Sequence, residues 1–168
     1  MEFEVTDFSL EKFIAEQGFN QETVSRVQTA DLIFLPSFRP FEGAPRAFQP
    51  DTLNFYKFLR RTNLDLNVEL LENEGEEKTV SLHSYDIWLP VIWVAQEFLL
   101  PTIPSLIASY VYDRLRGTFT GETVDIHLNL YIRNEEKGIT KHLDFSGPKE
   151  IFEKKFGTID LNKMWEDD

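Results

Sequence analysis

The chain has 168 residues, 42% of them hydrophobic and 14% aromatic, which is enough apolar material for one folded core and excludes an intrinsically disordered chain. It has no cysteine, so disulfides, iron–sulfur clusters and thiol nucleophiles are excluded. Its formal net charge of −12 opposes direct binding to nucleic-acid phosphates or anionic membranes, and is compatible with plain solubility, a basic protein partner or mimicry of nucleic acid. We expect one domain over residues 1–168, in the cytoplasm because the first residues carry no secretory signal.

The first third of the chain predicts two short helices and a strand. Apolar residues at helical spacing predict a helix over Ser9–Gln17 that Gly18 ends. Asn20 is a good N-cap for a second helix that runs to about Gln28. The uninterrupted apolar run Asp31–Pro36 is typical of a strand buried on both faces.

An aromatic and basic loop follows, over Ser37–Gln49. Arginine beside aromatic rings is a common interface anchor, so the loop is a candidate partner-binding surface; equally, its phenylalanines could turn inward to cap the core. The candidate residues in this loop are Phe38, Arg39, Phe41, Arg46 and Phe48. Pro50 and Asp51 then begin a third helix.

Four segments alternate apolar and polar residues, as half-buried strands do. Leu64–Leu70 and Thr79–His83 predict one antiparallel hairpin, and Val124–Ile132 and Ile139–Phe145 predict a second. A closing helix begins at Gly147-Pro148, and Asp160–Asp168 is expected to be an acidic tail in which some apolar side chains dock. The expected fold is therefore α+β, with a mixed or antiparallel sheet of about five strands (two β-hairpins plus one buried strand) covered by helices.

The segment Ile87–Ile107 is apolar apart from Glu97 and is long enough to cross a bilayer. Its three prolines and the acidic residue argue against membrane insertion and favour an apolar helical pair within residues 85–116, at about Asp86–Leu99 and Thr102–Arg116. Burial in the core is the favoured interpretation, followed by a protein interface and then the membrane. Trp88 and Trp93 exceed what one buried helix face needs, so we include them among the candidate partner-binding residues.

No pattern of an enzyme active site is present: the chain has no Walker loop, no Gly-x-Gly-x-x-Gly and no Gly-x-Ser-x-Gly. The three histidines, His83, His127 and His142, are expected on strand faces opposite the apolar one. If Leu128 pairs with Leu143, then His127 faces Asp144 and Asn129 faces His142. His127, His142 and Asp144 are weak candidates for a metal or general-base site, but an ordinary polar face is favoured, and no cofactor is expected.

The C-terminal half, with its apolar pair ending in Tyr110-Val-Tyr-Asp-Arg-Leu-Arg116, the strands Val124–Ile132 and Thr140–Phe145 and a short amphipathic helix, loosely resembles the effector-associated constant component proteins. These are small accessory parts of bacterial conflict and antiphage systems. The resemblance implies a non-catalytic adaptor that docks an effector or sensor protein, and it carries over no functional residue.

Three functions are therefore open. The first is an accessory or adaptor protein that binds a protein partner or a second copy of itself, in an antiphage defence system if the resemblance holds. The second is an acidic inhibitor or immunity-type protein that blocks a basic toxin or nuclease. The third is a small hydrolase that uses His127, His142 and Asp144. Salt dependence separates the first two, because binding through carboxylates weakens steeply as ionic strength rises.

Overall fold

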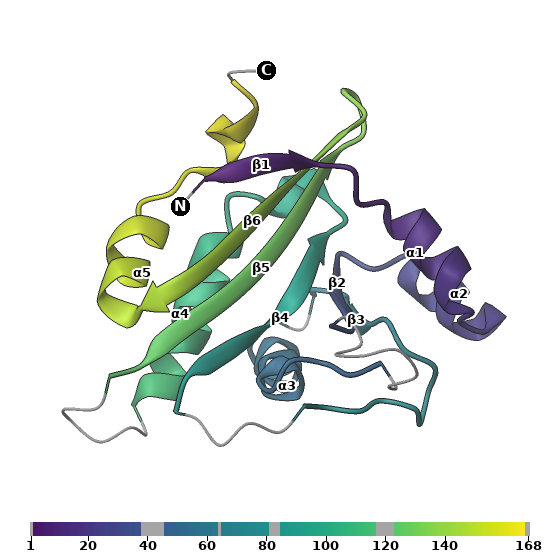
Figure 1. Ribbon diagram of the computed structural model, residues 1–168, viewed down its shortest axis with the longest axis horizontal. Coiled ribbons are helices and arrows are strands. Elements are labelled where there is room, and N and C mark those ends of the chain that lie inside the picture. Colours follow the sequence, from purple (N-terminus) through teal and green to yellow (C-terminus); the bar gives the residue numbers. More distant parts are fainter. Residues whose placement is uncertain (1, 38–45, 64, 81–84, 117–122, 167–168) are drawn as a thin grey trace.

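A computed structural model describes residues 2–37, 46–63, 65–80, 85–116 and 123–166. Its centre is a six-stranded mixed sheet in the order β1-β6-β5-β4-β2-β3 (Figure 1). The strands are β1 (Phe3–Thr6), β2 (Leu32–Leu35), β3 (Val68–Leu70), β4 (Ile87–Val94), β5 (Asp125–Asn134) and β6 (Ile139–Pro148). The expected α+β class is confirmed, with one strand more than the sequence predicted.

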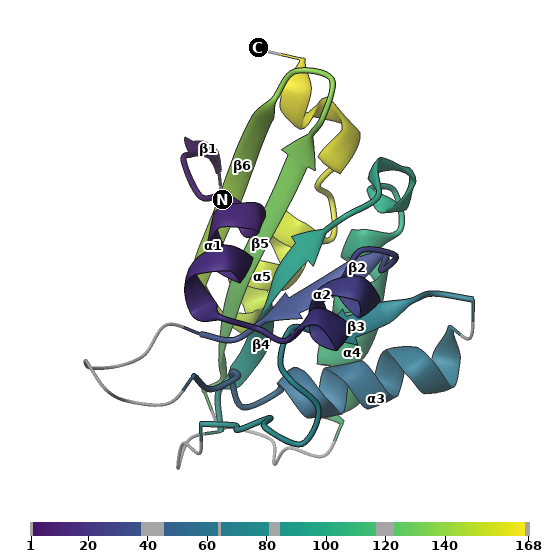
Figure 2. The ribbon, with the colours of Figure 1, turned by 90° about the vertical axis from the view of Figure 1, so that its right-hand side faces the viewer.

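Five α-helices and two short 3₁₀ segments surround the sheet. In Figure 1, α4 lies behind the long strands β5 and β6; Figure 2, which looks from the right-hand side of Figure 1, places α1 and α2 in front. The elements are α1 (Leu10–Gln17), α2 (Gln21–Val27), α3 (Thr52–Thr62), α4 (Ile103–Leu115), α5 (Lys149–Phe156), η1 (Glu97–Leu99) and η2 (Leu161–Trp165).

The two faces of the sheet are covered unequally. The larger core joins alternate residues of the strands, such as Leu128 and Leu130, to buried side chains of α3, α4 and α5. The smaller core lies under α1 and α2 and consists of Val27, Ala30, Ile33, Leu35, Leu71, Trp93 and Tyr131. Two short helices cover only part of that second face, so the remainder of it is where a functional surface is expected.

The predicted N-terminal elements are confirmed, because their signals are local. Ser9 Oγ accepts a hydrogen bond from the backbone N–H of Lys12, and Gly18 ends α1 in a left-handed conformation (φ 70°). The Asn20 side chain caps α2 in the same way, and all four residues of β2 are buried. The helix expected after Pro50 is α3, with Asp51 at its N-cap.

The first half of the expected apolar helical pair is wrong. Ile87–Val94 is strand β4, which pairs parallel with β5 and antiparallel with β2, and only the second half is a helix, α4. An apolar run buried on both faces has no periodicity that separates a strand from a helix. The β-branched and aromatic residues around Pro90 favour the strand, and Pro90 sits at an irregularity in the β4–β5 pairing.

The first predicted hairpin is also wrong within the part of the chain that is described. β3 pairs parallel with β2, and Thr79 forms an isolated bridge with Phe48. Residues 81–84, which include His83, lie outside the described ranges, as do Phe38, Arg39 and Phe41. The edge strand β1, paired antiparallel with β6, was not expected from the sequence.

The second hairpin is confirmed, but its register differs by two residues from the expected one. Leu128 pairs with Phe145, His127 with Ser146 and Asn129 with Asp144. The turn between Asn134 and Ile139 sets this register: Gly138 has a positive φ of 66°, and the Asn134 side chain accepts from the backbone N–H of Lys137.

The C-terminal segment docks as expected. Leu161 is buried, and Lys141 Nζ donates to the carbonyl of Met164 (2.6 Å).

In the described part of the chain no helix has both the length and the apolarity needed to span a membrane.

Candidate functional site

A groove of about 480 Å³ lies between α1 and α2, over the sheet. Ile33 and Trp93 come from the strands beneath it, and charged side chains stand along it. We call it the α1–α2 groove; it is lined by Ser9, Leu10, Glu11, Ile14, Val24, Val27, Gln28, Ile33, Trp93, Ala95, Arg133 and Glu135. An apolar depression with a few polar groups is the usual form of a binding site, and this volume is within the range of such sites.

Helix α1 keeps its apolar side partly uncovered. None of its residues is fully buried, and Leu10, Phe13 and Ile14 remain half-buried although they point toward the smaller core. Apolar surface that stays in contact with water forfeits about 25 cal/mol per Å² that burial against a partner would recover. The apolar side of α1 is therefore a surface that a second molecule could cover.

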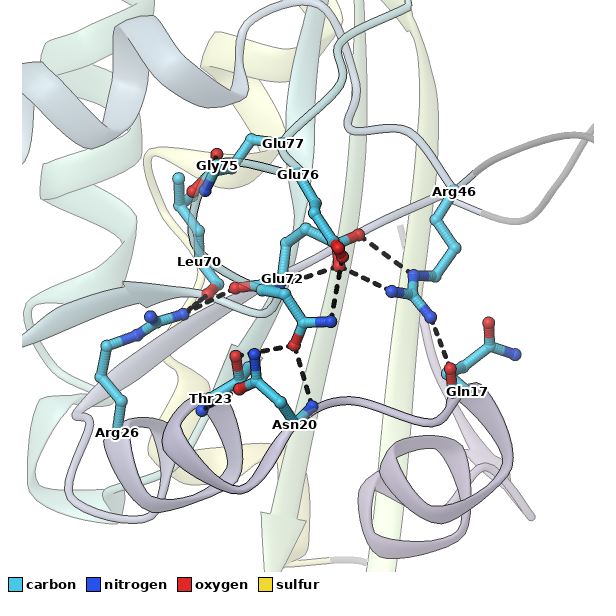
Figure 3. Close-up of polar contacts among 11 residues, drawn as sticks. Gln17, Asn20, Thr23, Arg26, Arg46, Leu70, Glu72, Gly75, Glu76 and Glu77 are labelled. Atoms are coloured by element: carbon cyan, nitrogen blue, oxygen red, sulfur yellow. Dashed lines mark hydrogen bonds and ion pairs between the residues drawn. The ribbon is translucent and has the colours of Figure 1, made fainter.

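A buried ion pair anchors the turn between α1 and α2 (Figure 3). Arg46 donates through Nη2 (2.6 Å) and Nε (3.0 Å) to the two carboxylate oxygens of Glu72, which is only 2% exposed. Nη1 of Arg46 donates to the carbonyl of Gln17 at the end of α1, and its guanidinium lies 4.2 Å from the centre of the Phe19 ring. One side chain thus ties the end of α1 to the segment after β3.

Two further contacts anchor α2 to the same segment (Figure 3). Asn73 Oδ1 accepts from the backbone N–H of Asn20 and from Thr23 Oγ1, both at 2.9 Å. Arg26 Nη2 donates to the carbonyls of Leu70 and Glu72. The α1–α2 groove is therefore preformed, because polar contacts, most of them half-buried, hold both of its walls to the segment after β3.

The open remainder of the same sheet face carries a row of polar and aromatic residues. The Trp88 ring stacks on His127 at 3.6 Å, and Tyr131 stacks on His142 at 4.2 Å. Residues five apart on a regular strand face opposite sides, but the irregularity between Trp88 and Val91 inserts one residue, so Trp88 and Trp93 share this face. We call it the polar row; its members are Trp88, His127, Asn129, His142, Asp144 and Ser146.

His127 lies between a carboxylate and a hydroxyl. Its Nδ1 is 2.9 Å from Ser146 Oγ, and its Nε2 is 3.4 Å from an oxygen of Asp86. The other carboxylate oxygen of Asp86 accepts from the backbone N–H of Asp125 (3.1 Å), which fixes its orientation. A serine, an imidazole and a carboxylate in this order are the groups that activate a hydroxyl nucleophile.

The three weak metal candidates are not brought together. Three cross-strand pairs lie between His127, which faces Ser146, and His142, which faces Tyr131. His142 Nε2 instead contacts Asn129 Oδ1 at 2.9 Å. Within the described ranges no three His, Cys, Asp or Glu side chains are grouped so that they could hold a metal ion.

The candidate partner-binding residues that the structure describes lie in different surroundings. Phe48 is fully buried, with its backbone hydrogen-bonded to Lys78 and Val80, which agrees with the alternative in which the phenylalanines of this loop turn inward. Arg46 is engaged by Glu72 and anchors the site instead of reaching a partner. Trp93 is 6% exposed in the α1–α2 groove, and Trp88 is half-buried in the polar row. The sequence pattern misses the groove because it places Trp93 on a helix.

The surroundings of the His142 imidazole favour its neutral form. Burial lowers the pKa of His142 below its usual value of 6.5, and the carboxylates of Asp144 and Glu4 only partly oppose this. Tyr131, stacked on the ring, has a pKa raised by burial and by Asp144, so it stays uncharged beside His142.

We therefore expect the free energy of unfolding to fall as the pH falls from about 7.5 to about 5.5, because the unfolded chain takes up a proton near pH 6.5 that the folded His142 resists. The loss ends once the pH passes below the folded pKa. Urea unfolding at both pH values measures it, and His142→Asn should remove part of the difference. An unchanged pH dependence in that variant would contradict the assignment.

Comparison with known proteins gives no relative: no protein-family model, no curated protein and no solved structure matches the chain. What the protein does must therefore follow from the geometry of the site.

Proposed function

We propose that this protein is a non-catalytic accessory or adaptor protein of the cytoplasm, which binds a partner effector or sensor protein through the α1–α2 groove. The observation that carries the proposal is the groove itself, a preformed depression with a mixed polar and apolar lining and Trp93 at its floor. A bacterial antiphage system is the setting that the resemblance of the C-terminal half implies. That resemblance does not cover α1 and α2, which form the walls of the groove.

Three features of the site support binding rather than chemistry. The apolar side chains of α1 are half-buried, as in an element completed by a partner. The walls of the groove are anchored by Arg46 and Asn73, so the protein loses little conformational entropy when a partner binds. Aromatic residues, which dominate interface energetics, lie both in the groove and in the adjoining polar row.

Affinity purification from cells that encode the protein tests the proposal. A tagged chain should retain one protein in stoichiometric amount, and Ile14→Asp, which places a charge in the groove, should lose it. Ile151→Asp is the matched control, because Ile151 is 43% exposed on α5, which packs on the opposite face of the sheet. The retained protein must then bind the purified chain directly; equal retention by both variants would refute the groove as the binding site.

A second candidate function rests on Asp86, His127 and Ser146. In a serine hydrolase, Ser146 Oγ would attack an ester or amide carbonyl while His127 accepts its proton and Asp86 stabilises the imidazolium. This candidate predicts covalent labelling of Ser146 by a fluorophosphonate, abolished by His127→Gln. The adaptor proposal predicts no labelling above that of Ser146→Ala.

A further inference from the structure

The charges along the α1–α2 groove bear on which segment it would take. Glu11 on α1 and Glu135 after β5 contribute two carboxylates, against the single guanidinium of Arg133. Arg133 is already engaged, with Nε 3.2 Å from a Glu135 oxygen and Nη1 3.2 Å from Thr140 Oγ1. Glu11 is exposed on the first turn of α1, and the groove as a whole is acidic.

The N-terminal end of α1, which would otherwise favour an anion, is already capped. Ser9 Oγ accepts the backbone N–H of Lys12 at 3.3 Å, and Glu11 is itself the anion that the first turn of a helix favours. An acidic ligand would therefore be repelled by Glu11 and by the net charge of −12 of the chain.

Polar and apolar groups line the groove in similar measure, and the apolar ones form its floor and parts of both walls. Leu10 and Ile14 form one wall, Val24 and Val27 the other, with Trp93 between them. A lysine or arginine stem packs on such a surface while its charged end reaches a carboxylate at the rim. The indole of Trp93 is 6% exposed and packs beside Phe8 and Tyr131, so it closes the floor of the groove and offers the bound segment an apolar contact.

From these contacts we infer that the groove binds a short peptide segment of the partner that combines apolar residues with at least one lysine or arginine, whose cationic end lies against Glu11. The inference rests on the proposed function and specifies the chemistry of the bound segment. It also gives the net charge of −12 a role, because that charge steers a basic segment toward the groove and speeds association.

Selection from a phage-displayed library of random peptides on the purified chain tests this even while the partner is unidentified. Enriched sequences should contain apolar residues with lysine or arginine. Synthetic copies should bind at least about ten-fold more weakly to Glu11→Lys and to Gln28→Lys, two exposed positions in the groove whose replacement leaves the core intact. The control Ile151→Asp should bind them as the unmodified chain does.

Ionic strength gives an independent readout. Affinity for the selected peptides should fall only several-fold between about 0.05 M and about 0.5 M salt, far less than the steep loss expected of an inhibitor that binds through many carboxylates. Replacing the peptide lysine or arginine with glutamine should remove most of that dependence. Neutral apolar peptides that bind the groove independently of salt would overturn the inference and leave the proposed function standing. Acidic consensus sequences would overturn it as well. If the selected peptides bind the two groove variants as tightly as the unmodified chain, or if the selection enriches no peptide, the inference and the proposed function are both overturned.

Discussion

Replacing Glu72 with alanine is expected to lower the free energy of unfolding by about 3 to 5 kcal/mol, because it leaves the Arg46 guanidinium without its carboxylate in a nearly dry site. Glu72 also accepts the backbone N–H of Asn73, so the anchor of α2 is weakened in the same variant. Urea unfolding followed by tryptophan fluorescence measures the loss, and amide hydrogen exchange should show faster opening of α1 and α2 than of β5 and β6.

A double-mutant cycle separates the ion pair from simple loss of packing. Arg46→Ala should also destabilise, and the double variant should lose less than the sum of the two single losses, since no unpaired charge then remains. The exposed pair Arg133–Glu135 is the matched control: Glu135 is 82% exposed, and Glu135→Ala should change stability by no more than about 0.5 kcal/mol. Additive losses at Arg46 and Glu72 would contradict a coupled anchor.

Asp51→Ala is expected to have an effect of similar size, about 3 to 5 kcal/mol, on the side of the sheet that carries the larger core. Asp51 is 3% exposed and joins three elements: it accepts from Tyr110 Oη (2.7 Å), from Arg114 Nε (3.1 Å) and from the backbone N–H of Trp88 (2.9 Å). Its removal therefore leaves a buried hydroxyl and a backbone N–H in β4 without that acceptor. Thermal or urea unfolding measures the loss.

Tyr110→Phe is the graded comparison for Asp51→Ala. Burial and the neighbouring Asp51 carboxylate raise the pKa of Tyr110 well above its usual value, so the hydroxyl remains a donor at every working pH. Removing it deletes one hydrogen bond and should lower stability by about 1 kcal/mol. A loss as large as that of Asp51→Ala would show that Tyr110, and not the carboxylate, holds α3, α4 and β4 together.

The elements that the sequence predicted correctly are those fixed by neighbouring residues. Ser9, Gly18 and Asn20 determine where α1 and α2 begin and end through contacts within four residues. The alternation along β5 and β6 similarly reports which side chains face the core. Such signals are complete within a short stretch of chain, so they can be interpreted without the fold.

The candidate site depends on contacts that no local pattern contains. Arg46 and Glu72 are 26 positions apart, and their pairing arises only once β3 lies beside β2. Trp93 enters the groove because Ile87–Val94 is a strand, and it shares a face with Trp88 only because of the irregularity at Pro90. An apolar run buried on both faces conceals its own secondary structure, and with it the position of the site.

Site-specific photo-crosslinking in living cells tests the central claim most directly. With p-benzoylphenylalanine in place of Gln28, an exposed residue of the α1–α2 groove, illumination should yield one crosslinked protein. The same group in place of Ile151, on the opposite side of the sheet, should not yield it. Adducts of equal yield at both positions, or an adduct at Ile151 alone, would contradict the assignment of the groove as the partner-binding site.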